Sequence, residues 1–217
     1  SKDRKLRSSG TQVKDTHSPM SFRHFVLGAI AIFFYVGVEV GIPNISNLYM
    51  SKDPHVGPSV AGTFVAAYWF LMMCGRIIGG AIGGKVSSKT MLSNATMVAI
   101  IFILCLILIP KTITVHVLGA TVPLKMVFMF LTGLCTSVMW GAIFNLATEG
   151  LGKYTPIASG IFMALVCGGG IIPFIQGLVA DIVGEIGSYW IIIMGLAYIL
   201  FYALVGSKNV NRDIPTE

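Results

Sequence analysis

Charge is scarce in this sequence. Charged residues make up 11% of the 217 positions, hydrophobic residues make up 55%, and the mean hydropathy is +0.82. Soluble domains carry about 25% charged residues, so the composition excludes an ordinary globular core and predicts an integral membrane protein. The net charge of +6 is not gathered in a basic patch interleaved with aromatics, which excludes a soluble nucleic-acid-binding module.

The residue groups of common enzymes are also missing. The four cysteines show no metal-ligand spacing, and the four histidines form no HExxH motif. The sequence contains neither a GxSxG elbow nor a GxxxxGK[ST] phosphate loop. We therefore predict no enzyme activity, no bound metal or cofactor, and no ATP-driven pumping.

Long hydrophobic runs fill the chain instead. A run of roughly 20 apolar residues is long enough for a helix to cross about 30 Å of hydrocarbon. A transmembrane β-barrel would show alternating segments of about ten residues, and this sequence has none. We therefore predict an all-α integral membrane protein, a six-transmembrane-helix bundle. The six predicted spans are 24–49, 58–84, 91–110, 123–148, 155–182 and 188–206.

The predicted six-helix domain covers residues 23–206, between two polar flanks. After residues 1–22 the apolar run begins too late, and continues too far, to be the core of a signal peptide. We interpret residues 1–22 as a cytoplasmic arm or linker and residues 207–217 as a cytoplasmic tail. The chain starts at Ser1 without a methionine, which is consistent with processing and with a fragment.

The basic residues predict the orientation. With a cytoplasmic N-terminus, all of the 15 Lys and Arg residues lie on the inner side except Lys52, Lys111 and Lys125. Cytoplasmic loops are enriched in Lys and Arg. We therefore predict a multi-pass protein of the cell (inner) membrane with both termini cytoplasmic. In this arrangement Arg76 belongs to the cytoplasmic connection between the second and third spans.

Glu39 is the one ionised side chain between Phe25 and Tyr49. A carboxylate at membrane depth is costly unless it faces a polar interior. Offsets of four and seven residues place Tyr35 and Ser46 on the same helical face as Glu39. Two interpretations stay open, namely a structural bond to a neighbouring span and a role in binding substrate or protons.

Polar and aromatic side chains within the spans favour a sugar as the ligand. A sugar offers hydroxyls that need hydrogen-bond donors and acceptors, and it also offers a C–H face that can pack on an aromatic ring. A tryptophan can supply the ring, while amides and a carboxylate can supply the polar partners. The predicted substrate-binding residues are Glu39, Asn44, Trp140, Asn145 and Gln176.

Glycine clusters in the fifth span, and it occurs with proline in the first span at Gly41 and Pro43. Glycine adds backbone freedom and proline removes a helical hydrogen bond. Irregular backbone at membrane depth requires protein or a water-filled cavity around it, so we predict helices that bend around a cavity. Close helix packing is the alternative role of these glycines. The predicted bending residues of the fifth span are Gly168, Gly169, Gly170 and Pro173.

Two motifs lie in the run from Ile143 to Gly184. One has the spacing LG-x-x-T-x-x-x-S, and the other is a glycine-rich run that ends in P-x-x-x-G-x-x-x-D. With YVG-x-E in the first span and a Gly–Arg pair in the second, they resemble the C-terminal half of major facilitator superfamily sugar symporters. The resemblance is strongest to the fucose–galactose–glucose:proton symporter (L-fucose permease-like) family, and it covers residues 24–206. The matching residues are Leu151, Gly152, Thr155, Ser159, Gly168 to Gly170, Pro173, Gly177 and Asp181.

A further superfamily motif is degenerate here. The loop after the second span resembles the pattern G-x-x-x-D-[RK]-x-G-[RK]-[RK], and it retains Gly80, Lys85 and Lys89. Gly84 replaces the acid of that pattern. The resemblance implies a cytoplasmic loop motif, and Arg76 and Lys85 are expected to act in gating and topology at that end.

The resemblance implies secondary active transport of a monosaccharide by proton symport and alternating access. Such transporters have twelve spans in two six-helix halves around a midplane site. This chain would supply the C-terminal half, and the expected partners are a sugar, protons, membrane lipid and the N-terminal six-helix half. The family's main proton-coupling acid lies in that other half. Two alternatives stay open, a self-contained six-helix channel or homodimeric carrier, and a non-transporting membrane scaffold half.

Overall fold

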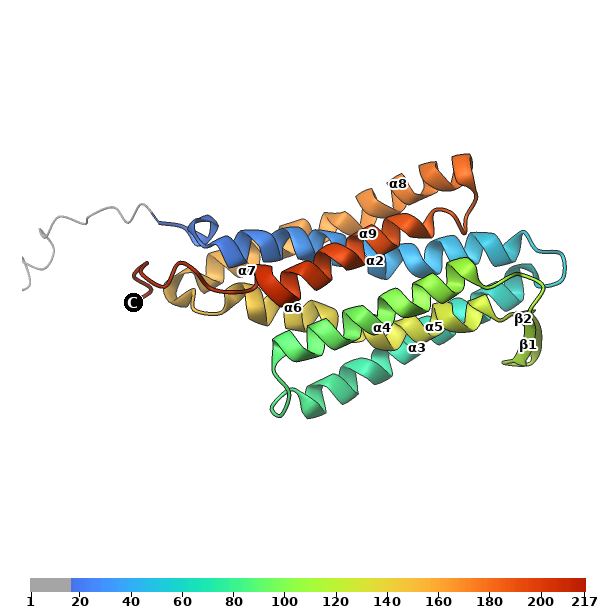
Figure 1. Ribbon diagram of the computed structural model, residues 1–217, viewed down its shortest axis with the longest axis horizontal. Helices are drawn as coiled ribbons and strands as arrows, with labels where there is room; N and C mark the ends of the chain where they lie inside the picture. The colour runs from blue at the N-terminus through green and yellow to red at the C-terminus, as the bar shows by residue number, and fades with distance from the viewer. Residues whose placement is uncertain (1–16) are drawn as a thin grey trace, which may run out of the picture.

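The computed structural model describes residues 17–217, and it contains six helical segments long and apolar enough to cross a membrane. They run up and down along the long axis of the molecule (Figure 1). This confirms the predicted all-α six-helix bundle. The segments are Arg23–Ser51, Gly57–Ile82, Ser88–Leu108, Lys125–Thr148, Gly152–Val183 and Tyr189–Gly206.

The first three spans are single helices, whereas the last three are divided. A short 3-10 helix, η1 (Pro19–Ser21), precedes the first span. The undivided spans are α2 (Arg23–Ser51), α3 (Gly57–Ile82) and α4 (Ser88–Leu108). The divided spans are α5 (Lys125–Ser137) with α6 (Met139–Thr148); η2 (Gly152–Tyr154), α7 (Thr155–Ala164), η3 (Leu165–Cys167) and α8 (Gly168–Val183); and α9 (Tyr189–Phe201) with the π-helical η4 (Tyr202–Gly206).

Local sequence signals account for several helix ends. The hydroxyl of Ser87 caps α4 by accepting a hydrogen bond from the main-chain N–H of Thr90, at 3.2 Å. Pro58 and Pro156 lie in the first turns of α3 and α7, where a missing N–H costs no helical bond. Gly184 ends α8 with a φ of +89°, a conformation that few residues other than glycine adopt.

A β-hairpin that the sequence did not predict joins α4 to α5. Strand β1 (Thr114–Val117) pairs antiparallel with β2 (Ala120–Pro123). The two residues between them, Leu118 and Gly119, both have positive φ, at 52° and 78°, as a tight hairpin turn requires. The strands are too short for a clear alternating pattern, and Leu-Gly lacks the Asn or Asp that signals such turns.

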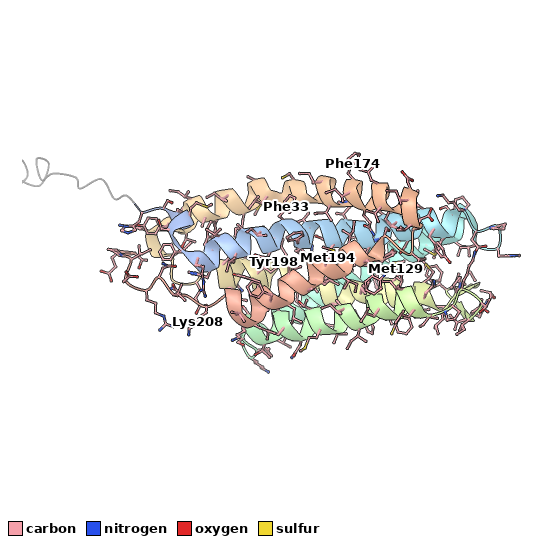
Figure 2. The ribbon with its side chains drawn as sticks, turned by 45° about the horizontal axis from the view of Figure 1, so that its top comes forward. Phe33, Met129, Phe174, Met194, Tyr198 and Lys208 are labelled. Carbon is pink, nitrogen blue, oxygen red and sulfur yellow. The ribbon has the colours of Figure 1, made fainter. Side chains whose placement is uncertain are left out.

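Helix α2 is the centre of the bundle. It contacts α3, α5, α6, α8 and α9, and Ile32, Tyr35 and Ile42 are completely buried along it. A side chain at Gly37 would overlap Ile172 of α8, so α2 and α8 pack closely. In contrast, Phe174 is well exposed on the far side of α8 (Figure 2).

The bundle has two ends, which differ in their connections (Figure 1). At the tail end lie the start of α2, the α3–α4 and α6–α7 connections, and the tail, residues 207–217. At the hairpin end lie the α2–α3 connection, the hairpin and the α8–α9 connection. The main-chain N–H of Lys153 donates to Thr216 at 2.9 Å, and that of Arg23 donates to Asn211 Oδ1 at 2.9 Å. These bonds hold the tail against the bundle.

The predicted division into arm, helical domain and tail stays a prediction. Residues 1–16 of the predicted arm lie outside the described residues. Among the described residues, α2 begins at Arg23 and the last helical turn ends at Gly206.

Candidate functional site

A cavity of about 810 Å³ extends from the middle of the bundle toward the tail end. It lies between α2, the second half of α3, the start of α4, the α5–α6 junction and the end of α7. Glycines make up much of its α3 wall, where they leave space that side chains would fill. Its polar and aromatic lining residues are Glu39, Arg76, Ser88, Ser137, Trp140 and Asn145.

Glu39 forms an ion pair with Arg76 in this cavity. The guanidinium Nη2 of Arg76 donates to Oε1 of Glu39 at 3.2 Å. The Glu39 side chain is 14% exposed and that of Arg76 is 54% exposed, so the pair stands on the cavity wall with its cation toward the open space. Glu39 therefore makes the structural bond to a neighbouring span and also lines a cavity that a ligand could reach.

The placement of Arg76 corrects a prediction. The count of basic residues assigned Arg76 to the cytoplasmic connection, although the predicted span 58–84 includes it, and α3 continues beyond Arg76 to Ile82. Arg76 therefore lies within α3 and faces α2. Nothing in the sequence indicated that Arg76 would pair with an acid 37 residues earlier.

Two tyrosines and a threonine connect the helices beneath Glu39. The hydroxyl of Tyr35 donates to the main-chain oxygen of Thr136 at 3.0 Å. The hydroxyl of Tyr68 donates to the main-chain oxygen of Glu39 at 3.0 Å and lies 3.2 Å from Thr136 Oγ1. These three side chains are completely buried. The network joins α2, α3 and α5 at the depth of Glu39 and fixes the backbone that carries the carboxylate.

The sequence indicated only part of this network. Tyr35 was placed on the Glu39 face, whereas Tyr68 and Thr136 were missed because single hydroxyls in a span resemble ordinary packing. Ser46, also predicted on that face, hydrogen-bonds instead with Tyr189 of α9, toward the hairpin end.

Trp140 and Asn145 lie on the α6 side of the cavity, where a sugar site was predicted. The ring of Trp140 stacks on Phe144, with centroids 5.4 Å apart and planes 7° from parallel. Asn145 is exposed, and its Nδ2 donates to Ser88 Oγ at 3.4 Å. The cavity therefore brings together Glu39, Trp140 and Asn145 from two separate spans.

Asn44 and Gln176 are not among the residues that line this cavity. Asn44 is exposed on α2, beyond Glu39 toward the hairpin end. Gln176 of α8 is completely buried, where its Nε2 donates to Ser188 Oγ at 3.4 Å and its side chain packs on Gly41. The roles of Asn44 and Gln176 in sugar binding stay predictions.

The fifth span departs from α-helix at η3 (Leu165–Cys167), directly before the glycine triplet. A side chain at Gly168 would overlap the main-chain oxygen of Phe33 in α2, while Gly170 has open space around it. Pro173 lies within α8, and α2 runs without interruption through Gly41 and Pro43. The fourth span also divides, at Val138, where no glycine or proline predicted a break.

The three loop-motif residues follow one another at the tail end. Gly80 lines the cavity near the end of α3. Lys85 is exposed in the turn after α3, and Lys89 is exposed in the first turn of α4.

The charges of the cavity balance. Among the described residues that line it, the charged ones are one acid, Glu39, and one base, Arg76. Within residues 17–217, no group of three or more His, Cys, Asp or Glu side chains is placed to hold a metal ion. The lining therefore has no net formal charge, so charge alone favours neither an anion nor a cation.

Two bacterial relatives match nearly all of this chain. The sequence is 37% identical over 198 residues to a glucose/galactose transporter of Brucella abortus, covering 90% of this chain and 45% of that protein. It is 35% identical over 201 residues to a putative glucose/galactose transporter of Helicobacter pylori, covering 90% and 47%. The chain therefore spans about half the length of these relatives. No protein-family model matches the sequence.

Solved structures match the fold. The major facilitator superfamily transporter FucP in the outward conformation aligns with a TM-score of 0.75 and 19% identity, over 94% of this chain and 45% of that chain. The Escherichia coli fucose:proton symporter FucP aligns with a TM-score of 0.76 and 21% identity, over 86% and 43%. The fold is that of half a major facilitator superfamily transporter. The relatives are transporters, which confirms the prediction that this multi-pass membrane protein is not an enzyme.

Proposed function

We propose that this chain, a homologue of glucose/galactose transporters of the major facilitator superfamily, is the C-terminal half of a proton-coupled monosaccharide transporter. Homology over about half of each relative supports a half-transporter. The resemblance of residues 143–184 to the C-terminal half of such symporters supports the assignment to that half. The N-terminal six-helix half and its proton-coupling acid would complete the site.

The observation that carries this proposal is the cavity with Glu39, Trp140 and Asn145 on its wall. Glu39 accepts hydrogen bonds from sugar hydroxyls, and Arg76 orients the carboxylate. Trp140 packs against the C–H face of the sugar, and Asn145 supplies both a donor and an acceptor. Asn44 and Gln176 are proposed to complete the set once the second half is present.

Alternating access requires that the cavity open on each side in turn. In the proposed orientation both termini are in the cytoplasm, so this cavity opens inward. Gly168, Gly169, Gly170 and Pro173, next to the interruption at η3, supply the bending that closes it.

Replacing Glu39 in a full-length transporter tests the proposed site. Hydrogen bonds to a charged group contribute about 1.5–3 kcal/mol, so Glu39→Gln is expected to weaken sugar binding roughly tenfold or more. Glu39→Ala is expected to weaken it further, because sugar hydroxyls lose an acceptor. The measurement is uptake of labelled glucose and galactose into proteoliposomes, with and without a proton gradient. Asp213→Asn, which changes an exposed acid of the tail that lines neither cavity, is the control.

Three outcomes would contradict the proposal. If Glu39→Ala carried sugar like the unchanged transporter across roughly pH 5.5–8, Glu39 would be a structural acid only. If the isolated chain carried sugar at the rate of the complete transporter, the alternative of a self-contained or homodimeric carrier would be correct. A chain that never supports sugar uptake with its second half restored would favour the scaffold alternative.

The orientation has its own test. Pro54 and Lys85 are exposed at the hairpin end and the tail end respectively. Single cysteines at these positions, in a background without the native cysteines, are expected to react with an impermeant reagent from opposite sides of the membrane. The Lys85 position should react from the cytoplasmic side. Reaction of both from one side would refute the six-span topology.

A further inference from the structure

A second cavity, of about 1020 Å³, lies at the tail end of the bundle. It is built by the start of α2, the α3–α4 connection, the end of α6 and the tail. It shares Ser88 and Asn145 with the cavity described above, so the bond between these two side chains lies where the two cavities meet. The sugar proposal assigns no role to the rest of its lining.

The lining of this second cavity is strongly basic. It contains four cations, Arg23, Lys89, Lys208 and Arg212, and one acid, Glu149, so its formal charge is four minus one, or +3. Within the described part of the chain, no salt bridge involves any of these four cations. Figure 2 shows Lys208 beyond the end of the last helix, on the tail. The four cations come from segments far apart in the sequence and converge on one space.

Two further features add to this positive field. The cavity includes Ser87 and Ser88 at the start of α4, where the N-terminal end of a 21-residue helix carries partial positive charge. The tail is held in place beside them, because Asn211 accepts a hydrogen bond from the main chain of Arg23. The cations of the tail are therefore positioned against those of α2 and α4.

One wall of the same cavity is apolar and open. Leu204 and Val205, in the last helical turn before the tail, line the cavity and are 50% and 56% exposed. Cations beside exposed apolar side chains, at the end of a membrane-spanning helix, match a lipid in which a charged headgroup adjoins acyl chains.

We propose that this second cavity binds a phosphate group, and that its usual source is the headgroup of an anionic membrane phospholipid. Arg23 and Arg212 can each donate two hydrogen bonds to phosphate oxygens, while Lys89 and Lys208 act as compact charges. The acyl chains would lie along Leu204 and Val205. A bound headgroup would connect the start of α2, the start of α4 and the tail. None of these four cations takes part in the proposed sugar site.

The test uses the purified 217-residue chain and lipids of defined charge. Native mass spectrometry counts phosphatidylglycerol and phosphatidylcholine molecules retained from mixed micelles. The unchanged chain is expected to retain phosphatidylglycerol preferentially. Lys208→Gln/Arg212→Gln is expected to weaken its binding about tenfold or more, because juxtamembrane cations contribute strongly to anionic-lipid binding.

A matched control distinguishes binding at this cavity from general attraction between surface cations and anionic lipid. Lys85→Gln/Lys153→Gln removes the same charge from the tail end, but neither residue lines this cavity. It is expected to retain phosphatidylglycerol like the unchanged chain. Equal loss in both double variants, or no loss in Lys208→Gln/Arg212→Gln, would overturn the proposal. Phosphatidylcholine binding as tight as phosphatidylglycerol binding would also overturn the proposal, except where free inorganic phosphate binds to the same cations.

Titration calorimetry with inorganic phosphate identifies the source of the phosphate group. Binding of free phosphate that Lys208→Gln/Arg212→Gln abolishes, without preference for phosphatidylglycerol, would support the phosphate site and assign it to a soluble ligand. Preferential phosphatidylglycerol binding without measurable phosphate binding would support the lipid. Binding of neither would overturn the proposal.

Discussion

At the hairpin end of the bundle two salt bridges join neighbouring connections, whereas at the tail end four cations line a cavity. Lys52 pairs with Glu185, which joins the α2–α3 and α8–α9 connections. Lys111 pairs with Asp53 at 3.3 Å and joins the hairpin connection to the α2–α3 connection. At the tail end, connections that carry Lys89 and Lys208 surround open space instead. Ion pairs between connections therefore hold the hairpin end together, whereas the tail end has cavities that a ligand could enter.

The boundary between the two ends crosses the fourth and fifth spans. α6 and the end of α7 line the first cavity, while α5 and α8, across the interruptions at Val138 and Leu165–Cys167, pack against α3 and α2. In each of these two spans, one half therefore lines the first cavity and the other half packs against neighbouring helices.

A comparison of Gly168 with Gly170 distinguishes a packing role from a bending role of the triplet. We expect the largest change in stability at Gly168. Gly168→Ala would place a methyl group against the main-chain oxygen of Phe33 and separate α8 from α2, at a cost of about 1–3 kcal/mol in unfolding free energy. Gly170→Ala meets open space, and should be neutral or stabilising by about 0.5–1 kcal/mol. Unfolding in detergent, followed by circular dichroism, measures both.

These two variants also test the proposed hinge. If Gly168→Ala leaves stability unchanged while both variants lower sugar uptake equally, the triplet acts through backbone freedom and the packing interpretation is wrong. If Gly168→Ala alone is impaired, close approach of α8 to α2 explains the glycine.

The Glu39–Arg76 pair should affect stability less than Gly168. Arg76→Met leaves the carboxylate of Glu39 without its cation, at a cost of about 1–2 kcal/mol, below the range for fully buried pairs because Arg76 is half exposed. Glu39→Gln/Arg76→Met should recover most of this loss, because no uncompensated charge remains. Lys111→Met, at the hairpin end, should cost less than about 1 kcal/mol. Equal losses of unfolding free energy in Arg76→Met and Lys111→Met would contradict the expected difference between the two ion pairs.

The sequence predicted the six spans well because the membrane imposes their length and apolar character. It predicted Glu39 as a site residue because an acid at that depth is costly without a reason. It could not predict that Arg76 turns toward Glu39, since helix-to-helix contacts depend on how α2 and α3 rotate against each other. Gln176 shows the same limit, because a polar residue within a span can equally face a cavity or a neighbouring helix.

The smallest expected effect is a weakening, at low pH, of the contacts that Asp53 makes at the hairpin end. The main-chain N–H of His55 and, to a lesser degree, Lys111 hold the pKa of Asp53 below its ordinary value. A lowered pKa in the folded state means that Asp53 contributes stability fully above its unfolded pKa of about 4, and loses that contribution as pH falls through the lower folded value.

Hydrogen–deuterium exchange of residues 111–123, corrected for intrinsic rates, should therefore accelerate between about pH 6 and pH 3, by a local free energy of less than about 1 kcal/mol. Asp53→Asn should show faster exchange already at about pH 6 and a weaker pH dependence. Asp213→Asn changes an acid at the tail end and should leave the hairpin unaffected. If Asp53→Asn keeps the full acid response, another group closes this end, and Glu185 is the next to replace because its hydrogen bond with Lys52 also lowers its pKa.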